Sequence, residues 1–110
     1  MIDLQTLRSL LDDEELVRKY LQRFSVDMPA LVDQMHHACD DQQWGQLSIH
    51  AHTLKCQMLY INEPIATGLA YELEMMGASS SPQVYQIDNL LKCLEDQLKC
   101  ILEDVHTITG

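Results

Sequence analysis

An apolar stripe toward the C-terminus constrains the fold of this 110-residue chain more than any other feature. Its members recur with the period of an α-helix that has one buried face. They are Ile87, Leu90, Leu91, Leu94, Leu98, Ile101, Leu102 and Val105. Such a face needs partners to cover it, and the sequence contains no strand pattern, internal repeat or low-complexity linker. We therefore predict an all-α protein whose last helix is opened by Ser81 and Pro82.

Two helices are expected in the first third of the chain. A short one covers Leu4 to Leu11, with Asp3 as its N-cap. The acids at 12–15 open a second helix, because the helix dipole favours negative charge in the first turn. Pro29 lies inside this second helix and lacks a backbone donor, so the helix should kink or break near Asp27–Met28. Its predicted apolar stripe consists of Leu16, Tyr20, Phe24, Leu31, Met35 and Ala38.

Capping signals divide the middle of the chain into two further helices. Residues 40–43 have the Asp-x-x-Gln spacing of a capping box, which would open a third helix that ends near Ile61. Asn62 and Pro64 would open a fourth, since asparagine caps helices and tolerates the left-handed conformation, and proline suits a first turn. Gly77 would end this helix as its C-terminal cap.

The architecture favoured by these helices is an antiparallel up-down four-helix bundle with a short N-terminal cover helix. Short connections place consecutive helices side by side and antiparallel. A chain of 110 residues is long enough for one core, so residues 1–110 should form a single domain.

Composition restricts the partners and the compartment. The formal net charge is −10 with 7 Lys and Arg, which argues against binding to nucleic acid or to an anionic membrane. No apolar stretch approaches the ~20 residues that span a bilayer, and the start lacks a basic region followed by a hydrophobic run. We expect a cytoplasmic monomer.

The third predicted helix carries a polar cluster around His52. Its core-facing positions leave His52 on an adjacent side together with Ser48, Lys55 and Cys56. Those core-facing positions are Leu47, Ala51, Leu54, Met58 and Ile61. A neutral imidazole can attack phosphorus when one ring nitrogen is free and positive charge is near. His52 is therefore a candidate phosphate acceptor, and Lys55 would stabilise the charge of the phosphoryl group on the same helix surface.

A wider pattern accompanies this pair. The His-Thr-Leu-Lys segment at 52–55 is preceded by Ala51 and stands within a longer series of matched positions. That series is Phe24, Leu31, Met35, Ala38, Trp44, Leu47, Leu69, Leu73 and Glu74. Together they resemble the histidine-containing phosphotransfer (HPt) domain, which passes phosphoryl groups between receiver domains in phosphorelays. The resemblance covers nearly the whole chain and implies the same helical fold.

The resemblance also implies a mechanism. His52 would take a phosphoryl group from the aspartate of one receiver or hybrid-kinase receiver domain and give it to another, with Mg²⁺ supplied by the receiver. The chain would have no cofactor and no metal of its own, and without a glycine-rich phosphate loop it would be a phosphoryl carrier rather than an enzyme. The residues expected beside the phosphoryl group or in the docking surface are Ser48, Thr53, Cys56, Gln57 and Leu59.

Four positions depart from the family pattern, and one of them is Gln43, which precedes Trp44 where family members commonly carry aspartate or asparagine. Cys56, Leu59 and Asn62 stand where family members usually carry a glycine, a small residue and a second glycine. These departures leave room for a second hypothesis, a non-transferring HPt-like docking module that binds and inhibits a histidine kinase or receiver. A third hypothesis is a structural adaptor that dimerises through the last helix. Cys56 itself has two interpretations, a redox gate beside His52 or an inert replacement of glycine.

Overall fold

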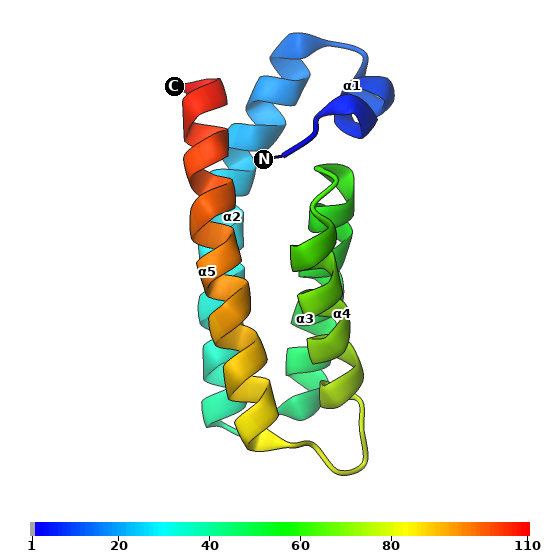
Figure 1. Cartoon of the computed structure of the whole chain (residues 1–110), viewed down its shortest axis with the longest axis vertical. Helices are drawn as coiled ribbons and strands as arrows, with labels where there is room; N and C mark the ends of the chain where they lie inside the picture. The colour runs from blue at the N-terminus through cyan, green and yellow to red at the C-terminus, as the bar shows by residue number, and fades with distance from the viewer. Residues whose placement is uncertain (1) are drawn as a thin grey trace.

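Five helices make up the part of the chain that the computed structural model describes, residues 2–110 (Figure 1). They are α1 (Gln5–Leu11), α2 (Glu14–Asp40), α3 (Trp44–Tyr60), α4 (Pro64–Gly77) and α5 (Val84–Thr109). No strand occurs within residues 2–110, so the prediction of an all-α protein is confirmed.

Helices α2 to α5 pack in a closed cycle. Each contacts the next in the chain, and α5 returns to contact α2. Figure 1 shows α2 and α5 running together along one side and α3 with α4 along the other. At about 1.5 Å per residue, α2 (27 residues) and α5 (26 residues) outreach α3 (17 residues) by roughly 15 Å. Helix α1 contacts α2 and crosses the end of the structure where α3 finishes.

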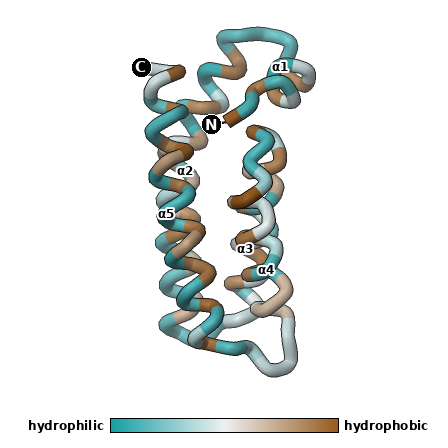
Figure 2. Tube along the Cα trace, viewed as in Figure 1, coloured by the Kyte–Doolittle hydropathy of each residue, from teal (hydrophilic) through white to brown (hydrophobic). Residues whose placement is uncertain are grey.

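The stripe on α5 forms one wall of the core, as predicted. Its most buried members are Ile87, Leu91, Leu94, Leu98, Ile101 and Val105. Leu90 and Leu102 are partly buried at the margin of this wall. Hydrophobic and hydrophilic residues alternate along α5 in Figure 2, as expected for a helix with one buried face. Within the described chain, no helix is both long and apolar enough to cross a membrane.

Helix α2 does not break at its proline. It continues through Pro29, so of the predicted kink or break near Asp27–Met28 the break does not occur. Proline removes one backbone hydrogen bond, but Phe24 and Val32 on either side are buried at 2% and 5% exposure. Ending the helix there would expose these side chains, and packing therefore overrides the local preference of proline.

The buried stripe of α2 also differs from the predicted one by a single residue at three places. Leu16 is 44% exposed and Tyr20 and Leu31 are only partly buried, while the next residue in each case is buried: Val17, Leu21 and Val32. These three residues continue a regular three- and four-residue spacing, and this spacing sets which face of the helix is buried.

Three predicted helix ends are shifted. Asp40 is the last residue of α2, and α3 begins at Trp44 without a side-chain cap, so the predicted capping box at 40–43 is wrong. The turn between them is made by Gln42 with a positive φ of 55°. Helix α5 begins two residues after Pro82, again without a side-chain cap. Gly77 lies inside α4 as its last residue rather than after it as a left-handed cap.

The turn between α3 and α4 holds the N-terminal segment. Asn62 adopts a φ of 55°, which confirms that this asparagine takes the left-handed conformation. Its Nδ2 donates to the Asp3 carbonyl at 3.1 Å and to Thr6 Oγ1 at 3.0 Å, rather than capping α4. The Asp3 backbone N–H donates to the Ile61 carbonyl at 3.0 Å, and the Asp3 carboxylate accepts from the Gln5 N–H that begins α1. These bonds attach α1 to the C-terminal end of α3.

Candidate functional site

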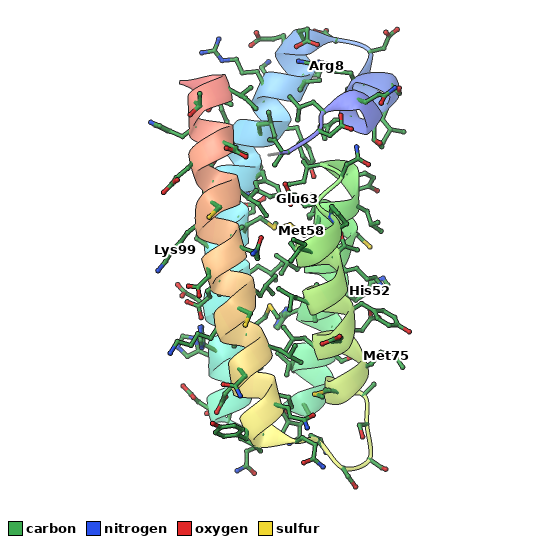
Figure 3. The ribbon with its side chains drawn as sticks, viewed as in Figure 1. Arg8, His52, Met58, Glu63, Met75 and Lys99 are labelled. Carbon is green, nitrogen blue, oxygen red and sulfur yellow. The ribbon has the colours of Figure 1, made fainter. Side chains whose placement is uncertain are left out.

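Helix α3 presents His52 to solvent. Its buried side is fixed in the core by Leu47, Ala51, Leu54 and Met58, all fully buried. This packing sets the rotation of the helix, so that the His52 side chain stays 56% exposed. In Figure 3 His52 lies on the side of the α3 and α4 pair that faces away from α5. The predicted exposure of the imidazole is confirmed.

A carboxylate from α4 joins His52 to Lys55. Glu74 Oε2 accepts from His52 Nδ1 at 2.8 Å, and Oε1 accepts from Lys55 Nζ at 2.7 Å. The bond from Lys55, reinforced by the one from His52, holds the pKa of Glu74 below its ordinary value of 4.5. The same bond raises the pKa of Lys55 above 10.5. Both groups are therefore charged at neutral pH.

This contact decides which nitrogen of His52 is nucleophilic. An ionised carboxylate only accepts hydrogen bonds, so in the neutral imidazole the proton resides on Nδ1. The lone pair is then on Nε2, at the opposite edge of the ring. A carboxylate on one ring nitrogen fixes the tautomer and the orientation of the ring. The arrangement is that of an oriented nitrogen nucleophile on an exposed helix face.

Two of the predicted neighbours share this site. Ser48 Oγ donates to the main-chain carbonyl of Glu74 at 2.9 Å and so ties α3 to α4 beside the carboxylate. Cys56 Sγ lies 3.8 Å from His52 Nε2, and this thiol is therefore the group that faces the free ring nitrogen.

Two other predicted neighbours lie on a different side of α3. Thr53 and Gln57 line a groove of about 400 Å³ between α2 and α3. The Thr53 hydroxyl donates to the Ile49 carbonyl, and Gln57 Oε1 accepts from the Tyr20 hydroxyl of α2. Burial, with Tyr60 nearby, raises the pKa of Tyr20 to about 12. The structure thus assigns Thr53 and Gln57 to the packing of α2 on α3 and does not bring them to the imidazole edge that faces Cys56.

A second groove, of about 600 Å³, lies between α3 and α4 beside the Lys55 ammonium. Leu59 and Tyr71 line it and are 53% and 50% exposed. Lys55 Nζ lies 5.5 Å from the centre of the Tyr71 ring, within the range of a cation–π interaction. Leu59, predicted as a docking residue, is therefore an exposed apolar side chain next to the charged cluster.

The surface around the site is apolar and poor in acids. Helix α3 contains no aspartate or glutamate, although the chain as a whole has 17. Six large apolar side chains on α3 and α4 are exposed: Ile49, Leu59, Tyr60, Ile65, Tyr71 and Met75. Surfaces of this kind mark interaction sites more often than ordinary solvated faces.

Glu74 is the functional residue whose role the sequence did not reveal. It was one matched position of the HPt-like pattern and had no contact assigned to it. Glu74 and His52 are 22 residues apart and lie on different helices, so helical periodicity places no constraint on their distance. A usable signal was a carboxylate directly after the buried Leu73, in a helix with only one other acidic residue, Glu72.

Acid is expected to release Glu74 from both partners. Its depressed pKa means that the ionised carboxylate stabilises the fold above the unfolded-state value of 4.5, and that this contribution is lost as the pH falls through the folded-state value. The unfolding free energy of the native protein should exceed that of Glu74→Gln at neutral pH, and the difference should shrink below pH 4.5. Urea denaturation between about pH 7 and pH 3 measures it.

Glu72→Gln is the matched control for this experiment, because Glu72 is exposed on the same helix and its replacement removes the same charge. A stability difference between the native protein and Glu74→Gln that stays constant into the acid range would contradict the assigned contacts.

Comparisons of this chain with protein-family models, with curated proteins and with solved structures give no match. Across residues 2–110 there is also no group of three or more side chains placed to hold a metal ion. Function must therefore be inferred from the chemistry of the site formed by His52, Lys55 and Glu74.

Proposed function

We propose that this protein is a histidine phosphotransfer protein of the HPt type. It relays a phosphoryl group between receiver-domain aspartates in a two-component phosphorelay through phospho-His52. In this proposal α2 to α5 are the antiparallel up-down four-helix bundle and α1 is its cover helix, which the closed cycle of helix contacts supports. The protein acts as a cytoplasmic monomer and has no kinase activity of its own.

The observation that carries this proposal is the bridge from Glu74 to both His52 and Lys55. It accounts for a polar cluster on an otherwise apolar face. A histidine that served only solubility would need no oriented ring, whereas an acceptor needs one nitrogen with its lone pair free and the other held.

The transfer step follows from this geometry. The lone pair of His52 Nε2 attacks the phosphorus of a receiver acyl phosphate, the N–P bond forms, and the bond from phosphorus to the aspartate oxygen breaks. The electron pair leaves with the aspartate carboxylate. Positive charge develops on the ring, and the Glu74 carboxylate on Nδ1 offsets it where it arises. The reverse sequence returns the phosphoryl group to a second receiver.

Lys55 keeps the site receptive to an anion. The Glu74 carboxylate alone would repel an incoming phosphoryl group, because like charges at short range disfavour each other. The ion pair with Lys55 leaves the cluster without net charge while the histidine is neutral. The contribution of Lys55 is thus partly to neutralise Glu74 and partly to offer its charge to the phosphoryl oxygens.

Docking would use the apolar surface of α3 and α4. Leu59, Tyr71 and Met75 are each about half exposed around the site. An interface of modest size and apolar character suits a partner that must dissociate after each transfer. The receiver would bring its aspartate and Mg²⁺ to this surface, so the chain needs no metal of its own.

Transfer from a phosphorylated receiver tests the proposal. A receiver domain carrying radiolabelled aspartyl phosphate is mixed with the native protein in the presence of Mg²⁺. The expected product is a label that acid removes and alkali does not, mapped by mass spectrometry to the peptide containing His52. A label on another residue would overturn the assignment of the acceptor. Binding of several receivers without any transfer of label would favour the alternative, an HPt-like docking module that inhibits a kinase or receiver.

A further inference from the structure

We propose that Cys56 is a thiol modification site, at which His52 activates the thiol to form a mixed disulfide with a low-molecular-weight disulfide. The adduct covers Nε2 and so regulates the acceptor. The regulatory part of this inference rests on the proposed phosphotransfer, whereas the reactivity of the thiol does not.

Three groups at the site form the arrangement of an activated nucleophile. Cys56 Sγ lies 3.8 Å from His52 Nε2, within hydrogen-bond distance for sulfur. Nδ1 of the same ring is held by Glu74 at 2.8 Å. A nucleophile, a base within hydrogen-bond reach and a third group that orients the base are the signature of nucleophilic activation in proteins. Cys56 is partly exposed, so a small reagent has access to it.

The charge around the thiol favours the same chemistry. Thiolates form next to cations, and Lys55 directly precedes Cys56 on α3, with its ammonium held at the site by Glu74. The Glu74 carboxylate stabilises the imidazolium that results when His52 takes the proton.

The other three cysteines have no such environment. Cys39 is half-buried, and burial together with Asp88 and Asp40 raises its pKa to about 11. Cys93 and Cys100 are exposed on α5, and among residues 2–110 neither has a hydrogen-bonding base. Cys93 and Cys100 therefore serve as internal controls, because their thiols are more accessible than that of Cys56 but are not activated.

The reaction balances with the disulfide as its only co-reactant. His52 Nε2 takes the proton from Sγ, and the thiolate attacks one sulfur of the disulfide. The bond between the two reagent sulfurs breaks, the bond between Cys56 and one of them forms, and the other leaves as a thiolate. That thiolate takes the proton back from the imidazolium. Cys56 is oxidised, half of the reagent is reduced, and the ring returns to its starting state.

The two reactions of the site exclude each other, because both use Nε2. A phosphoryl group on Nε2 removes the lone pair that would accept the thiol proton. An adduct on Sγ fills the space from which a receiver phosphoryl group would approach Nε2. His52 would then accept a phosphoryl group when Cys56 is a free thiol and would not accept one when Cys56 carries the disulfide adduct.

Reaction with oxidised glutathione, followed by peptide mapping of all four cysteines, tests the activation. Cys56 is expected to be modified about tenfold faster than Cys93 and Cys100, and His52→Gln is expected to remove this advantage. Glu72→Gln, an exposed carboxylate on α4 with no contact to the ring, controls for a general change of charge. Equal rates for Cys56 and Cys100 in the native protein, or an unchanged rate at Cys56 in His52→Gln, would overturn the inference.

Phosphoryl acceptance tests the regulation. Label transfer is measured on one sample before treatment, after adduct formation and after reduction with dithiothreitol. We expect loss and recovery of transfer in the native protein, and the same transfer before and after treatment in Cys56→Ser, whatever its level. Full transfer to the adduct would overturn the regulatory inference. A native protein that never accepts label but shows the fast thiol would instead count against the proposed function alone.

Discussion

Replacing His52 by glutamine is expected to abolish acceptance of a phosphoryl group from a receiver. Glutamine keeps a polar side chain of similar reach but has no ring nitrogen with a lone pair that can attack phosphorus. The His52 side chain is 56% exposed, so the unfolding free energy should change by no more than about 0.5 kcal/mol. Label transfer and urea denaturation on the same preparation separate loss of chemistry from loss of fold.

His50→Gln is the matched control. His50 is two residues earlier in α3 and about 200° away around the helix, so its replacement removes a histidine without touching the cluster. Transfer to this variant should equal transfer to the native protein. Acid-labile label on His52→Gln at the native level would contradict the assignment of the acceptor, and binding that survives while transfer is lost would show that docking does not depend on the imidazole.

The sequence predicts the helices well because their stability comes from long apolar stripes. The stripe of α5 was placed correctly over about five turns, since each buried residue supports the same face. Helix ends were placed less well. The Asp-x-x-Gln signal at 40–43 and the proline at 29 are local preferences, each worth about 1–3 kcal/mol, and tertiary packing of the neighbouring residues outweighed both.

Part of the candidate site could likewise be predicted from the sequence, and part could not. His52, Lys55 and Cys56 lie on one helix, so three- and four-residue spacing was enough to place them together. The contact with Glu74 depends on how close α4 approaches α3 and at which register. The apolar pattern of neither helix predicts this distance or register. Both depend on Gly77, which on its own indicates a helix end but lies within the contact between the two helices.

Replacing Gly77 by alanine is expected to destabilise the protein by about 1–3 kcal/mol. A Cβ at this position would lie 2.7 Å from the Trp44 carbonyl oxygen and 3.0 Å from the Ser48 backbone nitrogen. Both are backbone atoms in the first turns of α3 and cannot move aside as a flexible side chain would. Helix α4 must shift instead, although alanine on its own favours a helix more than glycine does. Urea denaturation measures the change.

Gly45 and Gly68 are the controls, because a Cβ at either position meets nothing within 4 Å. Their replacement by alanine should leave stability unchanged or raise it by up to about 1 kcal/mol, since glycine is the poorer residue inside a helix. Opposite signs at Gly77 and at these two positions would show that close approach, not helix propensity, sets the effect. Gly77→Ala as stable as Gly45→Ala would contradict the tight packing of α4 on α3.

The same substitution tests how the fold builds the site. Glu74 precedes Gly77 by about one turn, and its main-chain carbonyl is tied to Ser48 of α3 at 2.9 Å. A shift of α4 at Gly77 would therefore carry the Glu74 carboxylate away from His52 Nδ1. Phosphoryl acceptance by folded Gly77→Ala should fall, and it should fall no further when Glu74→Gln is added, because the first change has already removed the contact. Additive losses would show instead that Glu74 keeps its place when the helices move apart.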